Sequence, residues 1–103
     1  MCHKLPTSVN ASMGSTAEFY CSCNSGHAIV WYIDQELVQE HNAERQINYR
    51  TTTRDGFFVS TLLVLASERN NNSRVECGVF EFGHGIIRPT NQEAAVLKVQ
   101  GKL

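Results

Sequence analysis

Short segments in which apolar and polar residues alternate recur along the whole chain. Examples are Phe19-x-Cys21-x-Cys23, Ile29-x-Trp31-x-Ile33, Val75-x-Cys77-x-Val79 and Ala95-x-Leu97-x-Val99. Turn-prone clusters such as Arg54-Asp55-Gly56 and Gly83-His84-Gly85 separate them, and residues 35–45 lack the apolar stripe of a helix. A period of two residues is typical of strands with one buried face. Many such strands divided by turns favour an all-β sandwich or barrel.

Length and composition limit the number of domains and the class of partner. The 103 residues, 42% of them apolar, suffice for a single domain over residues 1–103, with a core over about 5–100. A net charge of -1 argues against nucleic-acid binding and against polybasic attachment to membranes. The longest aliphatic run, Leu62 to Ala66, is too short to span a bilayer, and residues 1–6 do not resemble a secretory signal. We expect contact with a membrane only through a segment outside this sequence.

The four cysteines, Cys2, Cys21, Cys23 and Cys77, permit two disulfides in three possible connectivities. A zinc site would draw on Cys21, Cys23 and the nearby His27. Structural zinc sites favour two to four residues between paired cysteines, whereas a single residue separates Cys21 from Cys23. We therefore expect no metal site, and the pairing of the cysteines stays open at this point.

No arrangement of residues in the sequence indicates catalysis. The histidines, His3, His27, His41 and His84, are scattered, and no Asp or Ser lies at a spacing typical of a triad. No glycine-rich stretch resembles a phosphate-binding loop. We expect a protein that is not an enzyme and that uses no cofactor and no small-molecule substrate.

The order of Cys21, Trp31, the segment Leu62-x-Val64 and Cys77 resembles an immunoglobulin domain. The resemblance covers almost the whole chain and implies a two-sheet antiparallel β-sandwich. It also implies that Cys21 and Cys77 form the disulfide between the two sheets and that Trp31 packs against this bridge in the core.

The sequence departs from the family pattern in ways that narrow the resemblance. Val75 stands where the family places the tyrosine of the tyrosine corner, and Trp31 follows Cys21 more closely than is usual. The interval from Trp31 to Cys77 is short for a variable domain, which carries an additional strand. The resemblance is therefore to an intermediate-set or constant-2-like domain of the extracellular cell-surface type.

The same resemblance suggests a second disulfide, between Cys2 and Cys23. The first strand of the family runs antiparallel to the next one, through a turn that would fall near Met13-Gly14. The start of the chain would then return toward Cys23, and two cysteines can pair when their Cα atoms lie within about 7 Å. A first strand that switches between the sheets would shift this register.

Two acceptor sequences for N-linked glycosylation occur, Asn10-Ala11-Ser12 and Asn71-Asn72-Ser73. A sequon that is used marks the surface of a secreted protein. The family resemblance places Asn71 in an exposed turn between strands, so we expect it to be the better acceptor of the two.

Strand alternation also assigns residues to the outer face of the sheet that holds Trp31 and Cys77. If these two point inward, the outward set is Val30, Tyr32, Phe80, Phe82 and Val96. A contiguous apolar cluster on the surface indicates an interaction site. The alternative is that a neighbouring domain, or the apolar segment from Gly85 to Pro89, covers this face.

The resemblance favours an extracellular domain of a cell-surface adhesion or recognition receptor. Such a domain would bind a protein partner, or a second copy of itself, through the outer face. It would belong to a larger membrane-anchored or secreted glycoprotein. Two alternatives stay open: an intracellular structural module of a muscle or cytoskeletal protein, and a secreted immune-type binder that recognises its partner with the loop from Gly83 to Ile87.

Overall fold

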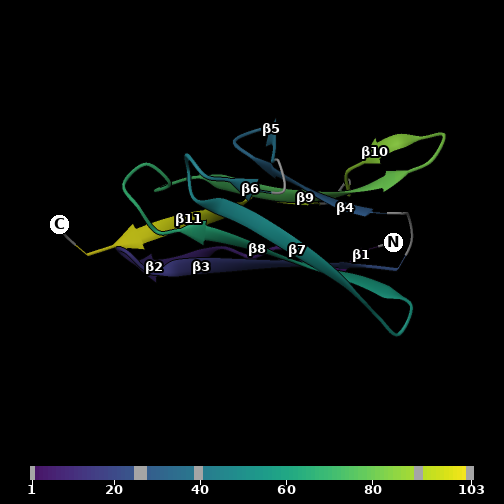
Figure 1. Cartoon of the computed structure of the whole chain (residues 1–103), viewed down its shortest axis with the longest axis horizontal. Coiled ribbons are helices and arrows are strands. Elements are labelled where there is room, and N and C mark those ends of the chain that lie inside the picture. The colour runs from purple at the N-terminus through teal and green to yellow at the C-terminus, as the bar shows by residue number, and fades with distance from the viewer. Residues whose placement is uncertain (1, 25–27, 39–40, 90–91, 102–103) are drawn as a thin grey trace.

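Two β-sheets lie face to face along the length of the molecule (Figure 1). The computed structural model describes residues 2–24, 28–38, 41–89 and 92–101, without the side chain of His41. Their strands are β1 (Cys2–Lys4), β2 (Val9–Ser12), β3 (Thr16–Cys23), β4 (Ala28–Ile33), β5 (Glu36–Leu37), β6 (His41–Asn42), β7 (Ile47–Arg54), β8 (Phe57–Leu65), β9 (Arg74–Glu81), β10 (Gly85–Ile87) and β11 (Ala95–Gln100). The described residues include no helix that could cross a membrane. The predicted all-β sandwich is confirmed.

The first strand of the chain is divided between the two sheets. One sheet has the order β1-β3-β8-β7-β6, and the other has the order β2-β11-β9-β4-β5, with β10 also paired to β9. The chain crosses from the first sheet to the second between β1 and β2, at Pro6, which has no N–H to offer a ladder. Because of this crossing, β2 pairs with β11 in parallel. The sequence predicted an antiparallel sandwich, and this pair is an exception to it. The switch leaves Cys2 directly opposite Cys23.

Two tight hairpin turns set the register of their strands. Asp34 and Gln35, with φ of 51° and 72°, connect β4 to β5. Asp55 and Gly56, with φ of 50° and 81°, connect β7 to β8. Two successive residues with positive φ are the mark of a type I′ turn, whose twist matches that of the strands it joins.

The core lies between the sheets and is joined by a disulfide. The Cys21–Cys77 bond connects β3 to β9 across the sandwich, with 6.5 Å between the Cα atoms, and confirms the predicted bridge. Trp31 is fully buried, and its indole Nε1 donates a hydrogen bond to the Ser60 hydroxyl at 2.8 Å. A buried indole N–H needs such a partner, and Ser60 supplies it from the opposite sheet.

A polar network is centred on the buried side chain of Asn70, near the position where Val75 replaces the family's tyrosine. The Asn70 Nδ2 donates to the carbonyl oxygens of Arg45 and Leu65, both at 2.9 Å. Its Oδ1 accepts from Arg45 Nε at 3.1 Å, and Arg45 Nη2 donates to the Ser73 hydroxyl at 3.0 Å. These bonds tie the segment before β7 to the segment before β9 without a tyrosine hydroxyl.

The last strand of the second sheet is also divided. Strand β10 pairs with the end of β9, and β11 pairs with its start. Between them the side chain of Gln92 takes the place of a strand: its Oε1 accepts from the Cys77 N–H and its Nε2 donates to the Cys77 carbonyl, both at 2.8 Å. The backbone of the buried Cys77 is therefore satisfied by an amide side chain.

Replacing Gln92 with alanine is expected to lower the free energy of unfolding by about 1–3 kcal/mol, because both backbone groups of Cys77 lose their partner. Urea denaturation followed by Trp31 fluorescence measures the loss. The exposed Gln100 on β11 provides a matched control, and Gln100→Ala should change the free energy of unfolding by less than about 0.5 kcal/mol. Equal losses in the two variants would contradict the role of Gln92.

Candidate interaction surface

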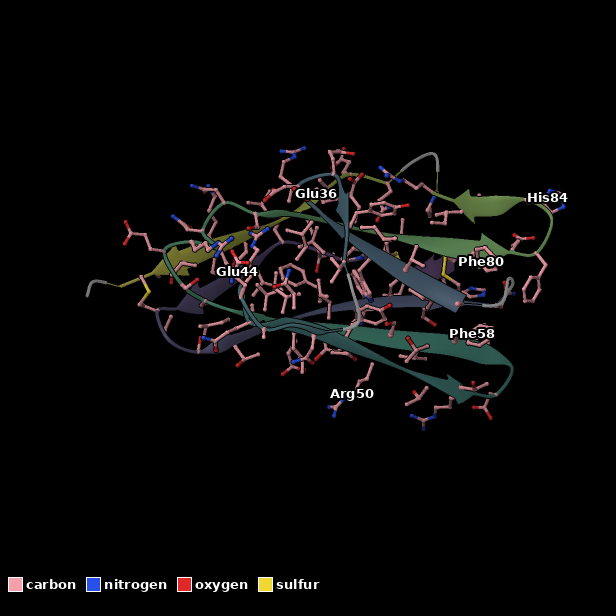
Figure 2. The ribbon with its side chains drawn as sticks, turned by 45° about the horizontal axis from the view of Figure 1, so that its top comes forward. Glu36, Glu44, Arg50, Phe58, Phe80 and His84 are labelled. Atoms are coloured by element: carbon pink, nitrogen blue, oxygen red, sulfur yellow. A yellow bond between two sulfur atoms is a disulfide. The ribbon has the colours of Figure 1, made fainter. Side chains whose placement is uncertain are left out.

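The outer face of the second sheet carries an apolar cluster at the end where β9 turns into β10. Phe82 is 69% exposed, and its ring lies edge-on to that of Phe80, with 5.4 Å between the centroids. Ile86 pairs with Phe80 across the hairpin and is 39% exposed. Figure 2 shows Phe80 and the hairpin tip at His84 at the same end of the molecule. We call Phe80, Phe82 and Ile86 the hairpin cluster; the half-buried Val30 lies next to it across β9, opposite Gly78.

Tyr32, predicted to face solvent in the same cluster, is only 9% exposed. The guanidinium of Arg88 lies over its ring, 3.7 Å from the centroid. Arg88 also donates to Gln35 Oε1 at 3.1 Å, and Gln35 Nε2 donates to Glu76 Oε1 at 3.3 Å. Arg88, the residue that follows β10, thus covers Tyr32. This agrees with the alternative prediction that the segment from Gly85 to Pro89 covers the outer face, at least at Tyr32.

The path of Arg88 depends on Gly78, the residue of β9 that lies between Glu76 and Phe80 on the outer face. A Cβ atom at position 78 would lie 3.2 Å from Ile86 Cγ2 and 3.2 Å from the Ile87 carbonyl oxygen. Contacts this short would require β10 to shift by a few tenths of an ångström. The absence of a side chain at Gly78 therefore lets the hairpin lie close to the sheet.

Val96, the fifth predicted residue, is not part of the hairpin cluster. It pairs with Arg74 at the start of β9, whereas Phe80 lies near the end of that strand. At about 3.3 Å per residue, this separation is roughly 20 Å. The physical reason is the division of the last strand into β10 and β11: β10 pairs with Phe80, whereas β11 pairs with β9 at Arg74 and Val75.

The predicted outward set lacks two exposed apolar residues of this face, Ile86 and Leu37. Ile86 was assigned instead to the segment that covers the face in the alternative prediction, whereas Leu37 was not considered. It lies on the short edge strand β5, pairs with Tyr32 and is 48% exposed. Leu37 was overlooked because residues 35–45 are mostly polar. The turn at Asp34 and Gln35 could have revealed it, because a two-residue hairpin turn fixes which residue lies opposite Tyr32.

The two sequons differ in exposure. Asn10 and Ser12 on β2 are both exposed. Asn71 is exposed as well, but its Oδ1 accepts a hydrogen bond from the Val99 N–H at 2.9 Å, and Ser73 of the same sequon is buried. Both acceptors are therefore at the surface, and the expected preference for Asn71 stays a prediction, although its side-chain oxygen is engaged by the fold.

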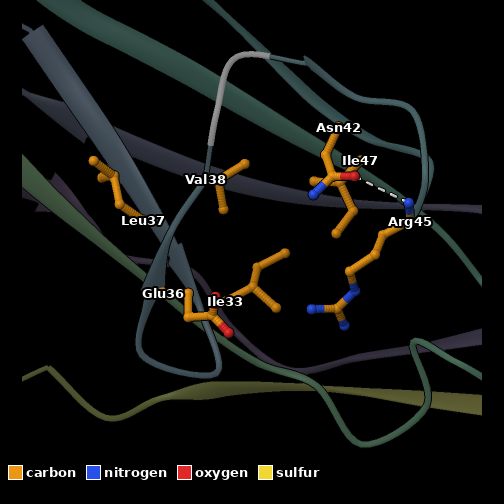
Figure 3. Close-up of a pocket in the computed structure, with 7 residues that line it drawn as sticks. All are labelled: Ile33, Glu36, Leu37, Val38, Asn42, Arg45 and Ile47. Carbon is orange, nitrogen blue, oxygen red and sulfur yellow. Dashed lines mark hydrogen bonds between the residues drawn. The ribbon is translucent and has the colours of Figure 1, made fainter.

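Two pockets lined by described residues are small. The first holds about 70 Å³ and lies at the edge of the sandwich beside β5 and β6 (Figure 3). It is lined by Ile33, Glu36, Leu37, Val38, Asn42, Arg45 and Ile47. The second holds about 250 Å³ where the chain leaves β1, and it includes Tyr20, whose pKa is raised by its hydrogen bond to Glu18. Pockets for small ligands typically measure about 300–1,000 Å³, so the surface is the stronger candidate for a functional site.

One group of described residues has the side chains that could hold a metal ion. The sulfur atoms of Cys2, Cys21 and Cys23 lie within 4.8 Å of one another. All three are in disulfides, however: Cys2 is joined to Cys23 with an S–S distance of 2.05 Å, and Cys21 is joined to Cys77. A metal requires thiolates, which these sulfurs are not. His27, weighed for the same site, lies outside the described residues.

The arrangement of strands matches solved structures of known proteins. The N-terminal eight Ig domains of Down Syndrome Cell Adhesion Molecule (DSCAM) isoform 1.30.30 match 98% of this chain with 19% identity and a TM-score of 0.70. The titin domains z1z2 in complex with telethonin match 99% with 20% identity and a TM-score of 0.65, and Rst D1-D2 matches 94% with 13% identity and a TM-score of 0.66. The chain has the immunoglobulin fold.

The likeness of this chain to these structures extends to the fold alone. The domain spans 14% of the DSCAM chain, 48% of the titin chain and 47% of the Rst chain. The strand orders β1-β3-β8-β7 and β4-β9-β11 correspond to the A-B-E-D and C-F-G sheets of the fold. A comparison of the sequence with protein-family models and with curated proteins finds no match.

Proposed function

We propose that this immunoglobulin domain is an extracellular protein-binding module of a cell-surface adhesion or recognition receptor. It binds through the outer face of the sheet formed by β4, β9 and β10. The hairpin cluster carries this proposal, because Phe82 exposes 69% of its surface next to Phe80 and Ile86. Aromatic residues are enriched at interface hot spots, and neighbouring exposed apolar side chains mark interaction sites.

The disulfides support a location outside the cell. All four cysteines are paired, and disulfides persist mainly in oxidising compartments. A domain of 103 residues also buries a limited core, which makes such cross-links valuable for stability. The fold of a named cell adhesion molecule is among the matches, in agreement with an adhesion role.

A structural module of a muscle or cytoskeletal protein is the second candidate, because the titin domains z1z2 match the same residues about as well. The state of the cysteines separates the two. Protein isolated from its native source under thiol-blocking conditions should carry two disulfides if the module is extracellular. Four free thiols would favour the structural module.

Replacing Phe82 with serine tests the binding surface. Hot-spot residues contribute about 2 kcal/mol or more to binding, so Phe82→Ser should weaken association at least about 30-fold while leaving the melting temperature unchanged. Analytical ultracentrifugation measures association with a second copy, and titration of the labelled domain onto cells measures association with another protein.

Tyr20 provides the matched control, since it is an aromatic residue of similar position on the outer face of the opposite sheet and is 41% exposed. Tyr20→Ser should leave association unchanged. The proposal is wrong if Phe82→Ser associates like the unmodified domain, or if the unmodified domain neither self-associates nor binds cells.

A further inference from the structure

The two disulfides differ in their access to solvent. Cys21, Cys23 and Cys77 are completely buried, whereas Cys2 is partly exposed at the edge of its sheet. Thiol–disulfide exchange starts when a thiolate reaches a sulfur atom of the bond. Of the four cysteines, Cys2 is the one that is not fully buried, so the bond is best approached from its side in the folded domain.

Apart from the disulfide and the packing of Cys2 against the core, strand β1 has few attachments to the sheet. It has three residues and two register partners on β3, with an irregularity between them. The ring of His3 lies edge-on to Phe57 at 4.8 Å, and Lys4 Nζ lies 5.4 Å from the centre of the Tyr20 ring. Both contacts are at the surface and are therefore weak.

The rest of the chain does not require β1 to stay in place. After Pro6 the chain joins the other sheet, where four residues of β2 are paired with β11. The Cys21–Cys77 bond connects the two sheets independently of β1. These two attachments would keep the sandwich closed if β1 left β3.

Departure of β1 would uncover Cys23. In the order β1-β3-β8, β8 covers one edge of β3, and β1 is the described strand on the other edge. Cys23 lies directly opposite Cys2 on β1 and opposite Phe58 on β8. With β1 detached, the Cys23 thiol becomes accessible at a free strand edge, although it is inaccessible while β1 is paired.

We propose that Cys2–Cys23 is a site of reversible reduction by a dithiol reductant and that its reduction detaches β1. A thiolate of the reductant attacks Cys2 Sγ, the Cys2–Cys23 bond breaks, and its electron pair passes to Cys23 Sγ, which takes up a proton. The second thiol of the reductant then attacks the reductant's own sulfur in the mixed disulfide, and Cys2 leaves and is protonated. One disulfide is reduced to two thiols, and one dithiol is oxidised to a disulfide. This inference is independent of the proposed binding surface.

Reduction of the folded full chain with dithiothreitol, without denaturant, tests the inference. Samples are blocked with N-ethylmaleimide at intervals, digested and analysed by mass spectrometry. Label should appear on Cys2 and Cys23 equally, at least about tenfold faster than on Cys21 and Cys77. Trypsin should cut after Lys4 only once the bond is reduced.

Two results would overturn the inference. Label on Cys2 without label on Cys23 would show that β1 stays paired after reduction. Loss of Cys21–Cys77 at the same rate would show that exposure does not select between the bonds. The double variant Cys2→Ser/Cys23→Ser provides an independent test: trypsin should cut it after Lys4 without reductant, while its unfolding remains a single transition. Protection of Lys4 in this variant would show that the disulfide does not hold β1.

Discussion

Replacing Cys21 and Cys77 together with alanine is expected to lower the free energy of unfolding by about 4 kcal/mol. The bond closes a loop with a sequence separation of 56 residues, and removing a cross-link of this length releases that much chain entropy in the unfolded state. Both sulfurs are completely buried, so their loss also leaves a void in the core. Urea denaturation of the oxidised domain, followed by Trp31 fluorescence, measures the change.

The double variant Cys2→Ala/Cys23→Ala is the matched control for this experiment. Its disulfide spans 21 residues and lies at a sheet edge, so its removal should cost less than removal of the bridge. If the two double variants lost the same free energy, the special role of the bond between the sheets would be refuted. Since small domains are stable by only about 5–15 kcal/mol, loss of the bridge should remove between about a quarter and four fifths of the total stability.

Replacing Asn70 with alanine is expected to lower the free energy of unfolding by about 3 kcal/mol. The Asn70 side chain is completely buried and makes three hydrogen bonds, two to carbonyls and one to the Arg45 guanidinium. Alanine would leave each of these partners unsatisfied, at about 1–3 kcal/mol for each group that water cannot reach. Thermal and urea denaturation both measure the effect.

The neighbouring Asn71 is exposed and accepts one hydrogen bond, from the Val99 N–H. Asn71→Ala should therefore cost no more than about 1 kcal/mol. A similar loss in both variants would mean that the bonds of Asn70 do not stabilise the contact between the segment before β7 and the segment before β9.

The parts of the fold that were predictable depend on local patterns and on a few residues with special geometry. Cys21, Trp31 and Cys77 occur in an order that few folds use, and the alternation around them places all three on inward faces. The turn at Asp55 and Gly56 follows from the need for two successive positive φ angles. These features act over a few residues, so the sequence displays them directly.

The parts that were not predictable depend on contacts between distant residues. Tyr32 alternates outward as expected, but its exposure is decided by Arg88, which no local pattern connects to it. Val96 was assigned to the correct face, but the division of the last strand moves it away from Phe80. Gln92 bonds the Cys77 backbone because the last strand is interrupted there. Nothing in the sequence around Gln92 indicates this role.

The contact between Arg88 and Tyr32 also affects how large an interface this face can form. Both contacts of the Arg88 guanidinium, with the Tyr32 ring and with Gln35, lie at the surface, where a cation–π contact contributes about 0.5–1 kcal/mol. In the proposed binding role, the contacts of a partner would offset a cost of this size if Arg88 moved aside. The Tyr32 ring, which Arg88 covers in the free domain, would then add aromatic contact area beside the hairpin cluster.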